Sequence, residues 1–323
     1  MRHAAFSVIA SFVLPFAGLS AQAQQYPSKP IQLVVPFAAG GNLDVVTRPL
    51  AQELSKRFGQ PVYVDIKPGA SGILGTQKVA KAAPDGYTLL MSATILVTTP
   101  TIMSNVTSYD PVNDFRGISM LGIVPQVLIV NPSLPVKNIP ELLQLAKSQP
   151  GKLNYGSGGT GSSSHLATEL FARQAGISLK RIPYKSSAPA LTDLIGGQTS
   201  MMFDNLSTAI PHIKSGRLKA LAVTTAARSP LLPDVPTASD SMPGYVAAQF
   251  NGIFAPAKAP KEIIARLHAE MLKFVELPAM QSLYVQQGVI LMASPSPEQF
   301  DEYVKAEYVR WTKVIKEAGI KEE

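Results

Sequence analysis

Glycines and hydroxyl side chains are concentrated in one short segment, GSGGTGSSSH at 156–165, which lies between an expected strand and an expected helix. A helix that begins here presents unpaired backbone amides and the positive end of its dipole, and both favour a bound anion. Serine and threonine hydroxyls beside those amides suit a carboxylate, which accepts charge-assisted hydrogen bonds. The segment therefore predicts an anion-binding loop, with candidate ligand-binding residues Ser157, Gly159, Thr160, Gly161 and Ser162.

The same segment satisfies the spacing G-x-G-x-x-G through Gly156, Gly158 and Gly161, a pattern of dinucleotide-binding sites. Its context differs from such sites. The preceding strand is short, and the acidic residue expected about 20 positions later is absent, since Lys185 and Ser186 stand there. The segment also has no P-loop lysine. We therefore expect no nucleotide and no other cofactor.

Nucleophilic catalysis is the alternative interpretation of this segment, because His165 and His212 accompany its serines. No serine lies in a G-x-S-x-G turn, and His165 follows the nearest serines on the same helix start. No third group that would orient the imidazole is evident. Two interpretations of His165 stay open: a histidine that caps or completes the loop, and the base of a secreted serine hydrolase-like enzyme with its site at 157–165.

Metal binding has little support in the sequence. Apart from His3, the histidines are far apart, and no H-E-x-x-H spacing occurs. The chain has no cysteine, which excludes disulfides, a thiol nucleophile and thiolate metal ligands. We therefore expect no metal site.

A second glycine-rich turn, PFAAGGNLD at 36–44, also follows an expected strand and precedes a helix. Gly40 and Gly41 let the backbone approach a ligand, and Asn42 can cap the helix. A third turn, PGASGILG at 68–75, has the same placement. Its signal is weaker, because a tight structural turn has the same composition.

Asp44 falls in the first turn of the helix that follows 36–44, and it has two interpretations. A carboxylate at this position is favoured by the helix dipole without any ligand. It could instead accept hydrogen bonds from a ligand ammonium or hydroxyl group. Pro49, further along the same helix, is expected to kink the helix or delay its start, because proline removes a backbone donor.

Short apolar runs alternate with helical periodicity after residue 30, which predicts an α/β fold with largely parallel sheets. The first series has strands at 31–37, 61–66 and 87–92 and helices at 45–58 and 77–83. The second series has helices at 139–148, 165–175 and 188–196 and strands at 153–155, 181–184, 201–204 and 220–224. Two further helices are expected at 260–276 and from Ser296 onward.

Two apolar runs connect these series. The run at 118–130 is too long for one ordinary strand and contains Pro125. The run at 250–255 follows a proline-rich passage. We interpret both as crossings between two domains, which implies a hinge. The chain length also favours two domains, because the roughly 300 residues that remain after removal of a signal peptide exceed what one hydrophobic core usually supports.

The composition predicts a compact exported protein. Hydrophobic residues make up 46% and charged residues 16% of the chain, which argues against disorder. Residues 1–23 are typical of a secretory signal peptide, with basic Arg2, an apolar stretch and a cleavage site after Ala23. The basic residues behind the net charge of +7 are scattered singly or in pairs, so no nucleic-acid partner is expected. We expect a soluble periplasmic protein.

Taken together, the motifs resemble the Bug family, the extracytoplasmic solute receptors of tripartite tricarboxylate transporters. They follow one another in order over nearly the whole mature chain: YPSKPIQLVVPFAAGGNLD, GQPVYVDIKPGASGILG, KAAPDGYTLLM, PGKLNYGSGGTGSSSHLATELF, IPYKSSAPALTDLIGGQTSMMFDN, LPDVPTASD and FAPAKAP. The ordered set is specific, whereas any one motif is a weak signal. The chain departs from the usual family pattern at Asn42, Leu43, Ser186 and Phe250, and we expect these positions to affect ligand specificity.

The resemblance implies a two-domain, type II-like periplasmic binding protein fold with the ligand cleft between the domains. With the two crossings, it places domain 1 at 24–124 plus 246–323 and domain 2 at 125–245. It implies a monomeric receptor, not an enzyme, that closes on a small organic carboxylate (a dicarboxylate, an amino acid or an aromatic acid) and docks on a membrane permease. In such receptors, loops like 37–44 and 157–165 face each other across the cleft. The ligand-binding residues implied in this way are Phe37, Ala38, Ala39, Gly40, Gly41, Asn42, Asp44, Thr94, Ser157, Gly159, Thr160, Gly161, Ser162, His165, Ser186, Ser187 and Asp204.

Overall fold

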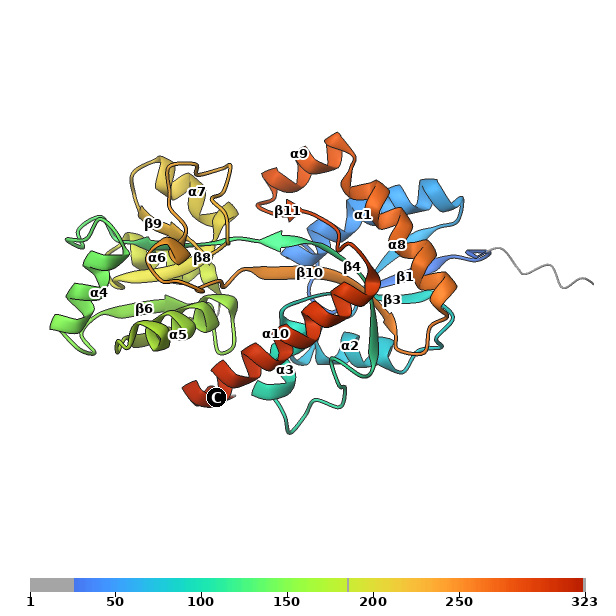
Figure 1. The fold of residues 1–323 in the computed structure, drawn as a ribbon, viewed down its shortest axis with the longest axis horizontal. Coiled ribbons are helices and arrows are strands. Elements are labelled where there is room, and N and C mark those ends of the chain that lie inside the picture. The colour runs from blue at the N-terminus through green and yellow to red at the C-terminus, as the bar shows by residue number, and fades with distance from the viewer. Residues whose placement is uncertain (1–25, 185, 322–323) are drawn as a thin grey trace, which may run out of the picture.

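The computed structural model describes residues 26–184 and 186–321, so the expected signal peptide at 1–23 lies outside the described residues. Within them, the strands form two sheets, each with its own helices, and Figure 1 shows the two resulting domains side by side. Among the helices of this described part, none is long and apolar enough to cross a membrane.

The first domain is built on a sheet with the strand order β11-β4-β10-β3-β1-β2. Its strands are β1 (Ile31–Val35), β2 (Val62–Ile66), β3 (Thr88–Ala93), β4 (Phe115–Val124), β10 (Gln249–Pro256) and β11 (Ile290–Leu291). Its helices are α1 (Asn42–Phe58), the short 3-10 helix η1 (Ala70–Gly72), α2 (Ile73–Ala80), α3 (Ile95–Ile102), α8 (Lys261–Val275), α9 (Pro278–Gln286) and α10 (Pro297–Ala318).

Helices cover both faces of this sheet, because the strands are apolar on both sides. In β1, Leu33 packs into the same cluster as α1 and α8, whereas its neighbour Val34 packs into the cluster that contains residues of α2, α3 and α10. Successive side chains of a strand point to opposite faces, so a strand buried on both faces reads as a continuous apolar run. Apart from Gln32, the run IQLVV is of this kind.

The second domain has the strand order β7-β6-β8-β5-β9. Its strands are β5 (Gln126–Val130), β6 (Asn154–Ser157), β7 (Lys180–Pro183), β8 (Met201–Asn205) and β9 (Lys219–Val223). Its helices are α4 (Ile139–Ser148), α5 (Ser163–Ala175), α6 (Ser187–Ile195), α7 (Leu206–Lys214) and the short 3-10 helix η2 (Ala238–Asp240).

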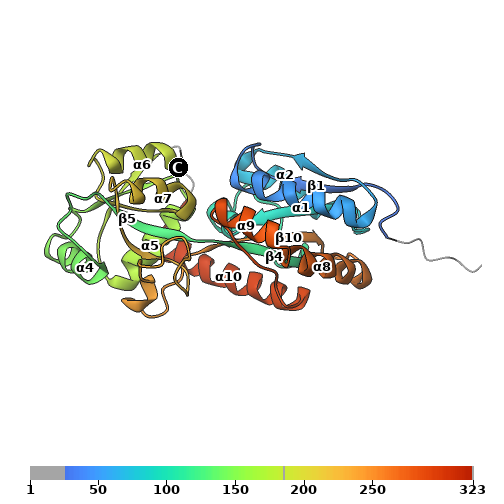
Figure 2. The ribbon, with the colours of Figure 1, turned by 90° about the horizontal axis from the view of Figure 1, so that it is seen from above.

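Two strand crossings and one helix connect the domains. β4 leads into β5 through Pro125, and the chain returns through residues 246–248 into β10. α10 packs on α3 and β4 of the first domain and also contacts α5 of the second. Figure 2 shows α10 along one side of β4 and β10, the strands that lead to and from the second domain, with α6 of the second domain and α2 of the first on the other side. The interpretation of 118–130 as an interdomain crossing is confirmed, whereas 250–255 lies within β10 of the first sheet, directly after the return crossing at 246–248.

The prediction of largely parallel sheets is wrong. β1 is parallel to β2 and β3, and β6 is parallel to β7 and β8. In contrast, β10 runs antiparallel to β3 and β4, and β5 runs antiparallel to β8 and β9. The reason is the crossing itself: β5 and β10 each enter a sheet from the other domain, so they run against the strands that the βαβ units supply.

Pro49 was expected to kink the first helix or delay its start, and the delay does not occur, because α1 begins at Asn42 and contains Pro49. Proline leaves the carbonyl four residues earlier, that of Val45, without its helical donor. Val45 is an exposed residue, so water can satisfy this carbonyl. The helix α3 was not predicted, because ILVTTPTI is rich in β-branched residues and contains proline. Burial of Leu96 and Val97 overrides this weak propensity.

Candidate functional site

The last residue of β6 and the loop that connects it to α5, together residues 157–162 (the β6–α5 loop), lead into the helix start that the sequence predicts. Ser162 caps α5, and its hydroxyl accepts a hydrogen bond from the His165 amide at 3.3 Å. No acidic residue occupies the first turn of α5. Gly159 and Gly161 have φ values of 113° and 71°, which only glycine adopts readily. The glycines therefore fix the loop conformation, and the serine fixes the first turn of the helix.

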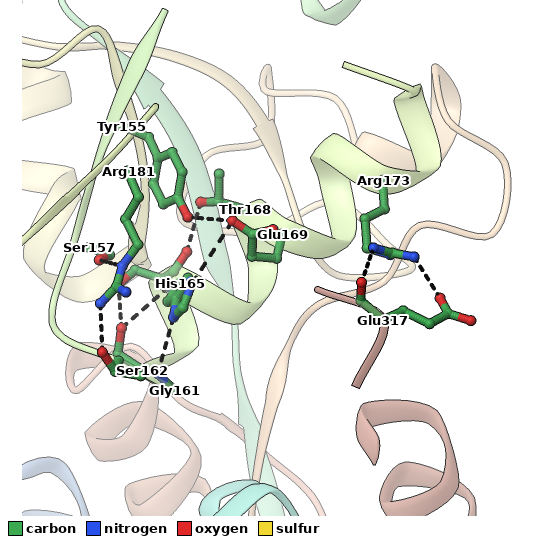
Figure 3. Close-up of polar contacts among 12 residues, drawn as sticks. Tyr155, Ser157, Gly161, Ser162, His165, Thr168, Glu169, Arg173, Arg181 and Glu317 are labelled. Atoms are coloured by element: carbon green, nitrogen blue, oxygen red, sulfur yellow. Dashed lines mark hydrogen bonds and ion pairs between the residues drawn. The ribbon is translucent and has the colours of Figure 1, made fainter. Parts of the chain in front are cut away.

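The side chain of His165 holds this loop through a hydrogen bond to its backbone. Its Nδ1 accepts a hydrogen bond from the Gly161 amide at 3.1 Å, and its Nε2 lies 3.9 Å from Oε1 of Glu169. Figure 3 shows the ring between these two partners, with Glu169 also accepting a hydrogen bond from Tyr155 at 2.6 Å. Burial, with a smaller effect of the Arg181 charge, lowers the pKa of His165 to about 4. The imidazole is therefore neutral near pH 7 and its Nδ1 is an acceptor.

This geometry differs from a Ser–His catalytic pair. The Ser162 hydroxyl accepts from the His165 backbone and lies 3.0 Å from the Ser164 hydroxyl, while the ring nitrogens face Gly161 and Glu169. A general base has to hydrogen-bond the nucleophile that it deprotonates. The interpretation of His165 as a residue that completes the loop is the one that the structure supports.

Arg181, which the sequence did not identify as a site residue, lies against the β6–α5 loop. Its Nε donates to the Ser157 hydroxyl at 3.1 Å, and its Nη2 donates to the Thr160 hydroxyl at 2.9 Å. Figure 3 shows its side chain directed toward the loop. The parallel register of β6 and β7 pairs Arg181 with Tyr155, two residues before Ser157. Sequence alone shows only the pair Lys180-Arg181, because strand register cannot be read from one chain.

The predicted residues at the starts of α6 and α7 lie beside this loop. Ser186 is exposed and precedes α6, and its side chain makes no capping hydrogen bond. A Cβ atom at Gly158 would lie 2.9 Å from the Ser187 hydroxyl, so the two loops are in close contact. Asp204 is buried and accepts hydrogen bonds from Ser187 and, at 2.6 Å, from Thr208. Burial raises the pKa of Asp204 to about 6.

The loop between β1 and α1, residues 36–41 (the β1–α1 loop), is organised by Asp44. One carboxylate oxygen of Asp44 accepts from the Gly40 amide at 2.8 Å, and the other lies 2.9 Å from Nε of Arg48. Ala38, Ala39, Gly40 and Gly41 are exposed, whereas Asp44 is buried. The exposed Asn42 accepts a hydrogen bond from Asn251 of β10 at 3.3 Å. A Cβ atom at Gly72 would lie 2.8 Å from the Phe37 ring, so Phe37 packs on the turn before α2.

Thr94 faces the β6–α5 loop across a cavity between the domains. Its hydroxyl accepts from the Phe250 amide at 3.0 Å, which ties the start of α3 to the hinge strand β10. The cavity has a volume of about 70 Å³, and its lining residues are Thr94, Ile95, Thr98, Gly161, Ser162, Ser163, Leu166, Ala247, Ala248, Gln249 and Trp311. Typical ligand pockets have about 300 Å³ or more, so this cavity by itself does not hold an organic acid.

The structure thus brings the predicted residues together in two groups. The β6–α5 loop, Ser186, Ser187 and Asp204 form one wall on the second domain, and Thr94 faces that wall. The β1–α1 loop and Asp44 form a separate group on the first domain. Sequence reasoning missed Arg181, Gln249 and Trp311. Gln249 donates to Asn205 at 3.1 Å, and no local sequence signal marks a residue that a hinge strand contributes.

In the described part of the chain, no group of three or more His, Cys, Asp or Glu side chains is arranged to hold a metal ion.

Comparison with known proteins gives consistent matches. Residues 46–320 match the family model described as tripartite tricarboxylate transporter family receptor. A protein of R. palustris solved with adipate is 36% identical, with a TM-score of 0.76, covering 91% of this chain and 99% of that one. The periplasmic binding protein BugD is 36% identical, with a TM-score of 0.73, and the match covers 92% of this chain and 100% of BugD. MatC of Rhodopseudomonas palustris, solved with bound malate, is 30% identical, with a TM-score of 0.73, and the match covers 90% of this chain and 100% of MatC. These matches confirm the expected fold class and the resemblance to the Bug receptors.

Proposed function

The chain belongs to the tripartite tricarboxylate transporter receptor family, and from this premise we propose that it captures a small organic carboxylate between its domains and delivers it to a membrane permease. The family and its solved members are solute-binding receptors and not enzymes, as expected from the sequence. The solved relatives with adipate and malate support a dicarboxylate or a hydroxy acid as the ligand class.

One observation carries this proposal: the β6–α5 loop supplies hydrogen-bond donors for an anion. Its helix start has unpaired amides in the first turn, as every helix does, and no acidic residue there. Thr160 and Ser162 add hydroxyls, and Arg181 adds a positive charge behind Thr160. Thr94 of the other domain faces the same cavity, so a ligand here would contact both domains.

We propose domain limits at 24–124 plus 246–323 and at 125–245, with the hinge at Pro125 and at residues 246–249. Few backbone segments cross at these points, and crossings of this kind absorb the dihedral changes of hinge bending. The ligand would favour the closed form because it contacts both walls only when the domains approach. Closure is then a population shift that the ligand's differential contacts drive.

We also propose that the receptor acts in the periplasm after cleavage of residues 1–23. The signal-like composition of this segment and the similarity to a periplasmic binding protein support this location. N-terminal sequencing of the protein recovered from a periplasmic extract would find Gln24 as the first residue; recovery of the intact chain with the cytoplasmic fraction would contradict the assignment.

The single tryptophan of the sequence offers a direct binding assay. Trp311 is buried and lines the interdomain cavity, so its fluorescence should change when the domains move. The mature chain, unfolded and refolded to remove carried-over ligand, is titrated with adipate and malate and with the diamide of each. A saturable change with an acid and none with its diamide supports the proposal. Equal responses to acid and diamide, or no response to either acid, would refute it for these ligands.

Variants of the loop hydroxyls locate the carboxylate. Thr160→Val combined with Ser162→Ala should weaken acid binding at least about tenfold, since a hydrogen bond to a charged group contributes roughly 1.5 to 3 kcal/mol. Thr192→Val on α6 is the matched control, because its hydroxyl is exposed and donates within the helix to Ala188. Equal affinities of the double variant and the control would place the carboxylate elsewhere.

A further inference from the structure

We infer that Arg181 makes the β6–α5 loop the anion-binding half of the site, whereas Asp44 leaves the β1–α1 loop to contact an uncharged or cationic part of the ligand. The two loops have similar glycine-rich sequences and similar places before a helix, so the sequence predicts similar roles for them. The structure distinguishes them by the charge that each loop already holds. This inference rests on the proposed function and assigns an orientation to the ligand.

Arg181 places its guanidinium directly against two loop hydroxyls. It donates to Ser157 at 3.1 Å and to Thr160 at 2.9 Å, and its side chain is partly buried. A hydroxyl has one proton to donate, and when its oxygen accepts from a cation that proton is polarised toward another acceptor. Ser157 is fully buried, whereas Thr160 is partly exposed. Thr160 is therefore the hydroxyl through which Arg181 can act on a bound carboxylate.

The acidic groups that the structure describes beside the loop accept hydrogen bonds from neighbouring hydroxyls. Asp204, on the same wall, accepts from Ser187 and from Thr208. Glu169, on the next turn of α5, accepts from the Tyr155 hydroxyl at 2.6 Å and lies on the far side of the His165 ring from Gly161. His165 itself is neutral near pH 7, and the field of Arg181 contributes to its low pKa. The field of Arg181 therefore reaches the Gly161 side of the loop, where the helix start lies.

In the β1–α1 loop, the nearby cation Arg48 is already paired with a carboxylate of the chain. The carboxylate of Asp44, buried in the first turn of α1, accepts from the Gly40 amide at 2.8 Å. It also pairs with Arg48 through both oxygens, at 2.9 and 3.1 Å. The chain's own carboxylate thus occupies the position that an anionic ligand would take at this helix start. A second carboxylate there would find the Gly40 amide already occupied and would have to share Arg48 with Asp44, whereas a hydroxyl, amide or ammonium group could approach without this competition.

Acetate is a suitable probe because it is a carboxylate with almost no remaining structure. It is titrated into the mature chain while the backbone amide signals are followed by NMR. The amides at 159–163 should saturate at a lower acetate concentration than those at 40–43. In Arg181→Gln, the apparent affinity at 159–163 should fall at least about tenfold, as expected for loss of a charge-assisted interaction. Arg181→Lys, which keeps the charge, should recover most of it.

Two further readouts separate charge from structure. Arg217→Gln, an exposed residue of the same domain, changes the net charge equally and should leave the acetate response at 159–163 unaltered. The His165 ring, followed by NMR, should titrate at higher pH in Arg181→Gln than in the wild type, and Arg181→Lys should restore the lower value. A variant that had only disturbed the loop would not be rescued by lysine, and this result would overturn the inference.

The remaining outcomes are distinct from those that test the proposed function. Equal saturation of both loops, no acetate response at 159–163, or an unchanged response in Arg181→Gln would each overturn the inference. If neither adipate nor malate binds the wild type while acetate still binds at 159–163 in an Arg181-dependent way, the proposed ligand class fails and the inference on Arg181 stands.

Discussion

Replacement of His165 by asparagine tests whether this buried ring holds the β6–α5 loop as a neutral acceptor. The amide oxygen of asparagine can accept from the Gly161 amide in place of Nδ1, but asparagine does not titrate. The wild-type ring has a pKa lowered to about 4 from the ordinary 6.5, mainly by burial. The unfolded chain therefore takes up a proton at this histidine at a higher pH than the folded chain does.

The sign of the effect follows from this difference. The stability that His165 provides is present above pH 6.5 and is lost as the pH falls from 6.5 to 4, because protons then favour the unfolded chain. The full loss corresponds to about 3 kcal/mol, and about 2 kcal/mol of it falls between pH 7 and pH 5. Asp204, whose pKa is raised to about 6, acts in the opposite direction, since its protonation favours the folded chain as the pH falls through 6.

Because Asp204 is present in both proteins, the difference between wild type and His165→Asn isolates the histidine. Urea unfolding is measured at pH 7, 6 and 5 by circular dichroism. The free energy of unfolding of the wild type, relative to the variant, should fall by about 2 kcal/mol from pH 7 to pH 5. Parallel pH dependences of the two proteins would refute the account of His165 as a buried neutral acceptor.

Three other changes have defined outcomes in the same urea assay at pH 7. Ser162→Ala removes the cap of α5 and should lower the free energy of unfolding by about 1 kcal/mol; an unchanged value would mean that the cap does not stabilise this helix. Gly161→Ala forces a Cβ atom into left-handed backbone and against Ile102, so a loss of at least about 1 kcal/mol is expected, and a stable variant would contradict the loop conformation. Arg173→Gln breaks the exposed 2.9 Å pair with Glu317 between α5 and α10 and should cost less than about 1 kcal/mol; a larger loss would assign this pair a main role in joining the domains.

Much of the fold follows from hydrophobic periodicity, because most elements bury one continuous stripe or run. α4 was predicted at its observed bounds, 139–148, since Asn138 and Pro140 mark its start and Leu142 and Ala146 lie on its buried face. The relative direction of the strands could not be predicted in this way. β5 and β10 run antiparallel to their neighbours because they cross between the domains, and neither run differs in composition from a strand of a βαβ unit.

The site was predictable where its geometry is local. The cap Ser162 and the positive-φ glycines of the β6–α5 loop belong to one short segment, and a helix start fixes their arrangement. The role of Arg181 depends on the pairing of β7 with β6, and that of Trp311 depends on the path of α10 across the hinge. Such contacts join residues far apart in sequence, so a single chain without its structure gives no signal for them.

Thermal unfolding of the mature chain with a panel of aliphatic, aromatic and amino carboxylates, each beside its amide, tests the central claim most directly. At a hundredfold excess over its dissociation constant, a ligand adds about 2.7 kcal/mol to the stability of the folded state, which raises the unfolding midpoint. The account predicts that at least one acid raises the midpoint and that its amide does not. A panel in which no acid raises the midpoint, or in which acids and amides raise it equally, would contradict a carboxylate receptor.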